Sequence, residues 1–153
     1  MTLFSTEQVA LWHGLQQTVA QGLVHSIGVS NYSPTELAAL QGAVPAVNQC
    51  EMSVEGADNV TLGYCAAHGI RYQSYGAVRG CPFDAPAVVK AAAAHHVSPA
   101  QVCLRWTLEK GAIAAAGVGT NVSTVPEYAA ENLAVTSFRL TPSEVRALDR
   151  LQL

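Results

Sequence analysis

Charged side chains are scarce in this 153-residue chain. Lysine, arginine, aspartate and glutamate make up 12% of the residues, roughly half the share that is usual in soluble domains. The formal net charge is -3, and no stretch forms a basic patch, so the chain lacks the electrostatic footprint of a nucleic-acid-binding protein. We therefore expect no nucleic acid among its partners. The low charge and the hydrophobic share of 50% instead indicate that much of the surface is covered.

Long apolar runs are also missing. The longest near-apolar stretches, 86–94 and 112–118, contain a lysine or are shorter than the roughly 18 residues that a membrane-spanning helix needs. The first residues have neither a basic region nor an apolar core, and Glu7 follows them closely. No secretory signal and no membrane span are therefore predicted, although a chain that had already lost a targeting segment would look the same.

The cysteines and histidines lack the spacing of a site. No C-x-x-C pair occurs, and the surroundings are apolar strand or helix positions, as is typical of small buried side chains; the cysteines are Cys50, Cys65, Cys81 and Cys103. We predict reduced thiols, and hence a soluble, reducing compartment such as the cytoplasm or an organelle interior. Adjacent His95 and His96 would point to different sides of a helix, so no metal site is predicted.

Helical and strand patterns alternate along the chain without a linker, which predicts a single domain over residues 1–153. The predicted strands are 26–29, 46–50, 70–74 and 113–118. The first two predicted helices follow Ser5 and Ser33 and end at Gly22 and Gly42. The later ones are 58–68, 87–95, 98–108 and 125–133, followed by a closing helix after Thr141. This alternation indicates parallel β/α units joined by right-handed crossovers.

Three helix starts carry a capping-box pattern, in which Ser or Thr is followed three residues later by Glu or Gln. The pairs are Ser5 with Gln8, Ser33 with Glu36, and Thr141 with Glu144. Each of these helices is expected to bury an apolar stripe. The stripe of the helix after Ser5 is Val9, Trp12, Leu15 and Val19; that of the helix after Ser33 is Leu37 and Leu40; and that of the helix after Thr141 is Val145, Leu148 and Leu151.

Six sequence blocks follow one another in an order that identifies a family. They are 26–31 (SIGVSN), 47–51 (VNQCE), 64–70, 72–75, 98–106 and 131–133. Together they resemble the aldo-keto reductase barrel from its fifth strand onward. A complete barrel needs about 250 residues. The resemblance therefore implies an α/β fold that is half of a TIM-type β/α barrel, with about four parallel strands and surrounding helices.

The same resemblance implies positions that bind a nicotinamide cofactor. The carboxamide would be held by Ser30, Asn31 and Gln49. The nicotinamide ring would stack on Tyr75, and adenine would contact Glu131 and Asn132. Hydroxyl and amide groups at the carboxyl ends of barrel strands suit such a role. The alternatives are that Ser30 and Asn31 only open the loop before the next helix, and that Tyr75 packs at the rim of the barrel.

The adenosine end departs from the family pattern. There a Lys-Ser pair and an Arg grip the 2′-phosphate of NADPH, whereas this chain has Val122-Ser123 and Tyr128 at those places. Aligning residues 119–121 with the Lys-Ser pair instead supplies no cation either, and tight binding of the 2′-phosphate requires a cationic side chain. We expect NADP or NAD to bind only weakly, without a preference for NADPH. Arg79 lies in a loop that matches a pyrophosphate-contacting loop, but a solvated loop is the simpler interpretation.

Carbonyl reduction also requires a proton donor. In the family the Asp, Tyr, Lys and His that perform this chemistry lie on the first four strands, and here Lys90 and Lys110 fall on predicted outer helices. No catalytic residue is therefore predicted. Because half a barrel exposes two sheet edges, we predict a partner, either another protein or a second copy. The predicted function is a non-catalytic, structural or interaction subunit; the alternative is the C-terminal half of an NAD(P)H-dependent carbonyl oxidoreductase that needs a partner half.

Overall fold

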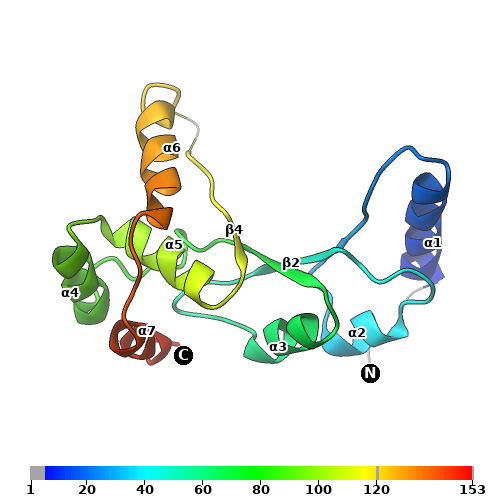
Figure 1. The fold of residues 1–153 in the computed structure, drawn as a ribbon, viewed down its shortest axis with the longest axis horizontal. Coiled ribbons are helices and arrows are strands. Elements are labelled where there is room, and N and C mark those ends of the chain that lie inside the picture. The colour runs from blue at the N-terminus through cyan, green and yellow to red at the C-terminus, as the bar shows by residue number, and fades with distance from the viewer. Residues whose placement is uncertain (1–5, 120, 153) are drawn as a thin grey trace. The chain divides into compact units, whose positions relative to one another are not determined.

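A computed structural model of the protein describes residues 6–119 and 121–152 (Figure 1). In chain order the elements are α1 Thr6–Ala20, β1 Val29–Ser30, α2 Pro34–Ala39, β2 Val47–Glu51, α3 Asn59–Ala67, β3 Arg71–Tyr75, α4 Pro86–His95, α5 Pro99–Glu109, β4 Ile113–Ala115, α6 Val125–Leu133, the 3-10 helix η1 Ala134–Thr136, and α7 Pro142–Asp149. The sheet has the order β1-β2-β3-β4, with β1 parallel to β2 and β3 parallel to β4. The predicted α/β class with four parallel strands is confirmed.

Several predicted strand ends were wrong by a few residues. Strand β1 begins at Val29 and not at residue 26, although the Ala46 N–H already donates to the Ile27 carbonyl at 2.8 Å. Strand β4 ends at Ala115 and not at residue 118. Beyond it Gly119 has φ +75, a left-handed conformation that an extended strand does not contain. Both edge strands are therefore shorter than the sequence predicted.

Two of the predicted capping boxes are confirmed. At the start of α2 the Ser33 N–H donates to Glu36 Oε2 at 2.8 Å, and the Glu36 N–H donates to Ser33 Oγ. Thr141 and Glu144 make the same exchange at the start of α7. Each box satisfies N–H groups that have no partner inside the helix, which stabilises two short helices.

The contacts divide the chain into two compact units, which we describe separately. Unit 1 comprises Met1–Cys50 and Asn59–Tyr72, and unit 2 comprises Glu51–Asp58 and Gln73–Leu153. In unit 1, α2 packs against α3, and the buried side chains include Trp12, Leu37, Cys50, Cys65, Ile70 and Tyr72. The boundary between the units falls within strands β2 and β3.

Helix α1 buries less of its apolar stripe than predicted. Trp12 is only 3% exposed, but Val9, Leu15 and Val19 are exposed. Those three positions were wrong as core residues, because within unit 1 the helix packs through the side that carries Trp12. In α2 Leu37 is buried, and Leu40, the residue that caps the end of this helix, is half-buried. Ser5 lies outside the described residues, so its capping box stays a prediction.

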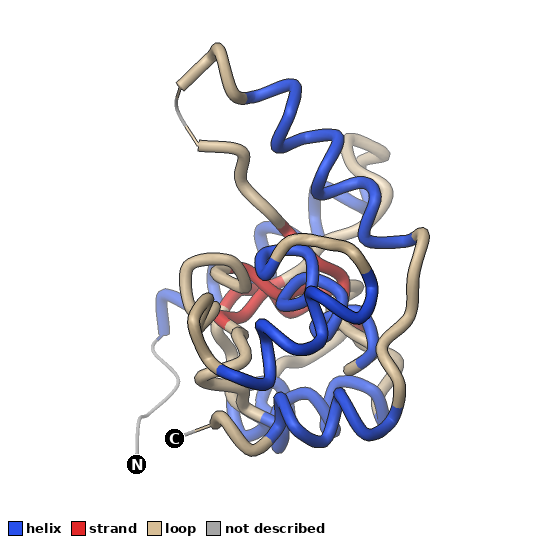
Figure 2. Tube along the Cα trace, turned by 90° about the vertical axis from the view of Figure 1, so that its left-hand side faces the viewer, coloured by secondary structure: helices blue, strands red, loops and turns tan. Residues whose placement is uncertain are grey.

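Unit 2 is centred on α5, in which every residue from 101 to 107 is buried. Helices α4 and α7 and the 3-10 helix η1 contact α5, and Leu148 of α7 is fully buried, as predicted. Val145 and Leu151 are half-buried. Helix α6 extends away from α4 and α7 and buries none of its residues (Figure 2).

The prediction of four reduced cysteines was wrong for one pair. Cys81 and Cys103 form a disulfide, whereas Cys50 and Cys65 are buried and not disulfide-bonded. The two paired residues are 22 positions apart in the sequence, and only the folding of the segment after β3 onto α5 brings them together. The inference of a reducing compartment loses that support. Among the described residues, no helix is long and apolar enough to cross a membrane.

Candidate functional site

Three of the predicted cofactor residues lie together in unit 1, where β1 and β2 run side by side. The Ser30 hydroxyl donates to the Gln49 carbonyl at 2.9 Å and accepts a hydrogen bond from Asn31 Nδ2 at 3.2 Å. The Asn31 N–H donates to the same carbonyl at 2.8 Å. The cluster is hydrogen-bonded and solvent-accessible, and it presents the hydroxyl and amide groups that can bind a carboxamide.

Two backbone features position this cluster. A Cβ atom on Gly28 would lie 2.4 Å from Val47 Cγ1 and 2.7 Å from the Val47 carbonyl oxygen, so only glycine allows the two segments to approach this closely. Asn31 adopts φ 59, a left-handed conformation that asparagine tolerates better than most residues. The chain therefore turns sharply after β1, which directs it into the cap of α2.

Asn48 supports the same turn and was not identified as a functional residue from the sequence. Its side chain is fully buried, donates to the Tyr32 carbonyl at 2.8 Å and accepts from the Tyr32 N–H at 3.3 Å. This two-point contact holds the segment after Asn31 against β2. A polar residue on the same face of the strand as the buried Cys50 was the available signal.

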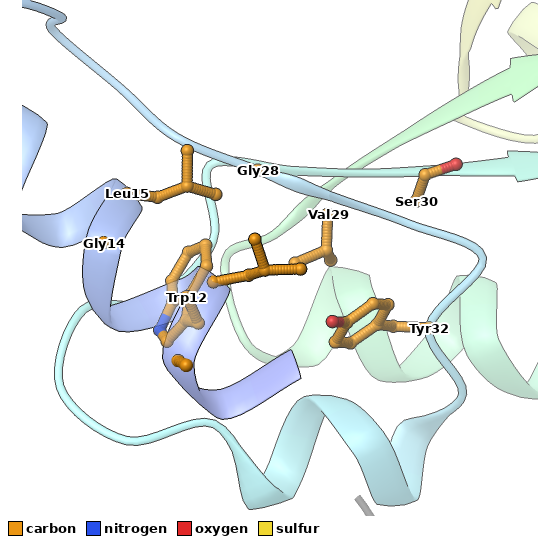
Figure 3. Close-up of a pocket in the computed structure, with 9 residues that line it drawn as sticks. Trp12, Gly14, Leu15, Gly28, Val29, Ser30 and Tyr32 are labelled. Atoms are coloured by element: carbon orange, nitrogen blue, oxygen red, sulfur yellow. The ribbon is translucent and has the colours of Figure 1, made fainter. Parts of the chain in front are cut away.

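An apolar hollow of about 800 Å³ lies beside the cluster in unit 1 (Figure 3). Trp12 and Leu15 of α1 face Val29 and Tyr32 across it. Burial raises the pKa of the Tyr32 phenol, and the nearby Glu36 carboxylate raises it further. Tyr32 is consequently a weaker proton donor than an ordinary tyrosine.

Tyr75 belongs to unit 2, where it is the last residue of β3 and half-buried. The loop that follows carries Arg79, which forms an exposed ion pair with Glu51. The hydrogen bond from Arg79 to Glu51, and the charge of that carboxylate, raise the pKa of the Arg79 guanidinium. Arg79 therefore lies in a solvated loop, as the simpler interpretation of the sequence expected, and has a carboxylate partner within the chain.

The two residues expected to contact adenine differ in their surroundings. The Glu131 side chain accepts a hydrogen bond from the Ser98 hydroxyl, and its backbone carbonyl accepts one from Gln101 Nε2 at 3.0 Å. Ser98 and Gln101 also form a capping box at the start of α5 that we had not predicted. Asn132 donates to the Gly117 carbonyl at 3.4 Å. Glu131 thus braces α6 against α5 through contacts between distant segments.

The residues at the expected phosphate end of the cofactor are exposed and uncharged. Val122 and Tyr128 are 84% and 44% exposed, and no cation stands between Gly117 and Asn132 in the sequence. Within residues 6–119 and 121–152, no group of three or more His, Cys, Asp or Glu side chains is arranged to hold a metal ion. The absence of a metal site stays a prediction.

Comparison with known proteins shows one family. The model of the "Aldo/keto reductase family" matches residues 3–152. The chain is 36% identical to an aldo-keto reductase of Mycolicibacterium vanbaalenii over 92% of its own length and 50% of that protein. It is 29% identical to aldo-keto reductase family 1 member A1 of Rattus norvegicus, over 96% of this chain and 48% of that protein.

Solved structures give the same result. An aldo/keto reductase from Brucella melitensis aligns with a TM-score of 0.87 and 25% identity, over 98% of this chain and 57% of that one. An aldo-keto reductase from Bombyx mori, in complex with NADP, aligns with a TM-score of 0.81 and 27% identity, over 92% of this chain and 49% of that one. The chain thus spans about half the length of the relatives it matches. It belongs to the aldo/keto reductase family and corresponds to about half of that family's barrel.

Proposed function

We propose that this 153-residue chain is, on its own, a non-catalytic half of an aldo/keto-reductase barrel, a pseudoenzyme that serves as a structural or interaction subunit of a larger assembly. The observation that carries the proposal is the chemistry of the strand ends. Ser30 and Asn31 are hydrogen-bonded to the Gln49 carbonyl, and Glu51 is paired with Arg79. These groups orient and bind, but they do not supply a proton donor.

The need for a partner rests on the open edge of the sheet. Strand β1 has β2 as its one neighbour in the sheet order, and the apolar hollow lined by Leu11, Trp12 and Leu15 lies next to it. Leu11 is 69% exposed. An uncovered strand edge beside apolar side chains favours association with another chain.

A second candidate function is the C-terminal half of an NAD(P)H-dependent carbonyl oxidoreductase. The hydrogen-bonded cluster of Ser30, Asn31 and Gln49 favours it, because this cluster matches the carboxamide positions that the family resemblance implies. A similar structure from Bombyx mori contains NADP. In this case the proton donor comes from a complementary half, on the same polypeptide or on a partner.

A steady-state assay of the purified chain separates the two candidates. With NADPH or NADH and a panel of aldehydes and ketones, we expect no turnover by the chain alone, because general acid catalysis contributes about 10²–10⁴-fold. The assay is then repeated after adding the complementary half of a similar reductase. Turnover by the mixture that is lost in Asn31→Ala, but retained in the exposed control Val60→Ala, would establish the second candidate. Turnover by the chain alone would refute the first.

Light scattering tests the need for a partner independently of turnover. We expect the chain to form oligomers or to bind other proteins, because β1 and β4 each present an unpaired edge in the sheet order. A stable, soluble monomer whose β1 and β4 amides are protected from hydrogen exchange would contradict this part of the proposal.

A further inference from the structure

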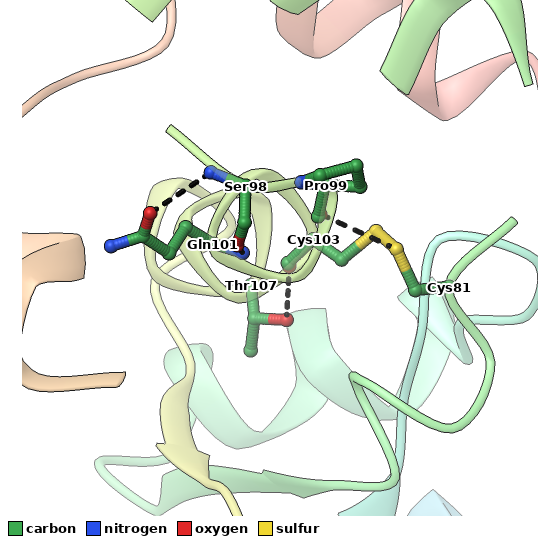
Figure 4. Close-up of a disulfide and its surroundings, with 6 residues drawn as sticks. All are labelled: Cys81, Ser98, Pro99, Gln101, Cys103 and Thr107. Carbon is green, nitrogen blue, oxygen red and sulfur yellow. Dashed lines mark hydrogen bonds between the residues drawn. A yellow bond between two sulfur atoms is a disulfide. The ribbon is translucent and has the colours of Figure 1, made fainter. Parts of the chain in front are cut away.

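The loop after β3 is fastened to α5 by the Cys81–Cys103 disulfide (Figure 4). Cys81 ends the short segment Gly76–Cys81, and Cys103 lies in the middle of α5. The Cα atoms of the two cysteines are 5.9 Å apart, and both residues are buried. A covalent bond between a loop and the central helix of the unit restricts how far that loop can move.

The remaining contacts of the loop are hydrogen bonds, apolar packing and one exposed ion pair. The Gly80 N–H donates to the Gly76 carbonyl at 3.0 Å, and Ala77 packs with Leu104 and Val135. Val78 packs against the same cluster, and Gly80 lies so close to Ser53 that a Cβ atom on it would be 2.3 Å from Ser53 Oγ. Arg79 pairs with Glu51 at the surface, where both side chains are more than half exposed. Exposed ion pairs contribute little to stability. The disulfide is the covalent constraint on this segment, and its other described contacts are non-covalent.

We propose that the Cys81–Cys103 disulfide is a redox-controlled tether for the Gly76–Cys81 loop. When it is oxidised, it holds the loop against α5; when it is reduced, the loop opens locally while the rest of unit 2 stays folded. Since the loop begins directly after Tyr75, the tether controls the carboxyl end of β3. This inference goes beyond the proposed function and does not depend on it.

The reductant is a dithiol. One of its thiolates attacks the sulfur of Cys81, which is 6% exposed whereas Cys103 is fully buried, and Cys103 leaves as the thiolate. The second thiol of the reductant then displaces Cys81 from the mixed disulfide. Two electrons pass to the protein, the reductant becomes a disulfide, and its two protons end on Cys81 and Cys103. The two other cysteines, Cys50 and Cys65, belong to unit 1, and so unit 2 contains only this pair.

The test uses the full chain in buffers of reduced and oxidised dithiothreitol. Free thiols are trapped by alkylation and counted by mass spectrometry, and hydrogen exchange is followed peptide by peptide. We expect Cys81 and Cys103 to become alkylated together, without denaturant. Amides between residues 77 and 85 should then exchange roughly tenfold faster or more, as expected when a disulfide constraint is lost. Amides of α7 should keep their protection.

Two variants serve as controls. The double variant Cys81→Ala with Cys103→Val should exchange quickly in this loop under both conditions, whereas Cys50→Ala should respond as the unchanged chain does. Three results would overturn the proposal: a disulfide that yields to the dithiol only after global unfolding, loop exchange that is equal in the oxidised and reduced chains, or native chain in which both thiols are free without reductant. The measurement on the unchanged chain decides the question even if the double variant does not fold.

Discussion

Replacing Asn48 with alanine tests the part of the structure that shapes the carboxamide cluster. The Asn48 side chain donates to the Tyr32 carbonyl at 2.8 Å and accepts from the Tyr32 N–H at 3.3 Å, and it is fully buried. In Asn48→Ala both Tyr32 backbone groups lose this partner. Each such loss costs about 1–3 kcal/mol. Because Tyr32 is half-buried and water can reach it in part, we expect a total loss of roughly 2–4 kcal/mol.

The assay is chemical and thermal unfolding of the unchanged chain and the variant. For a chain of this size each kcal/mol lowers the melting temperature by roughly 2–4 °C, so a decrease of about 5–15 °C is expected. Hydrogen exchange of the Tyr32 amide should accelerate as well. Asn132→Ala is the matched control, because the Asn132 side-chain amide donates one exposed hydrogen bond, at 3.4 Å, to the Gly117 carbonyl. This substitution should change the free energy of unfolding by no more than about 0.5 kcal/mol. Equal stabilities of Asn48→Ala and the control would refute the reasoning.

Three further predictions concern the close approach of Gly28 to Val47, the contact between α4 and α7, and cofactor binding. Gly28→Ala should destabilise the chain by about 1–3 kcal/mol because its Cβ would lie 2.7 Å from the Val47 carbonyl oxygen; Gly63→Ala, with open space around it, should be neutral or stabilising in the same denaturation assay. Burial raises the pKa of Glu144, but hydrogen bonds from His95 and Thr141 outweigh it and hold the pKa below its ordinary value of 4.5. Glu144 therefore contributes to the free energy of unfolding at pH values above 4.5, and this contribution is lost as the pH falls through the lower pKa of the folded state. In unfolding curves measured across this pH range, Glu144→Gln should lose less stability on acidification than the unchanged chain. An equal loss of stability with pH in the two chains would count against this prediction. Calorimetric titration should show weak binding of NADPH and NADH with no preference for NADPH, since a missing phosphate-binding cation removes roughly tenfold or more of that preference; submicromolar NADPH affinity well above that of NADH would mean that a cation reaches the phosphate from elsewhere.

The sequence alone was sufficient for features that depend on neighbouring residues. Ser33 with Glu36, and Thr141 with Glu144, form the predicted capping boxes, because a cap is decided by side chains three positions apart. The helix over 125–133 was predicted to the residue. The ordered blocks around Ser30 and Gln49 also identified the family, because they preserve the strand ends of its barrel.

Contacts between distant segments were decided only by the tertiary structure. The Cys81–Cys103 disulfide joins residues that are 22 positions apart in the sequence. The hydrogen bond from Ser98 to Glu131 joins residues that are 33 positions apart. Local pattern carries no information about such distances, and so the cysteines were predicted to be reduced and Glu131 to be available for adenine. The α1 stripe shows the same limit: its period predicts a helix with an apolar face, but the packing of unit 1 decides that only Trp12 is buried. Hydrophobic spacing determines which face of a helix is apolar, whereas burial depends on what the rest of the fold places against it.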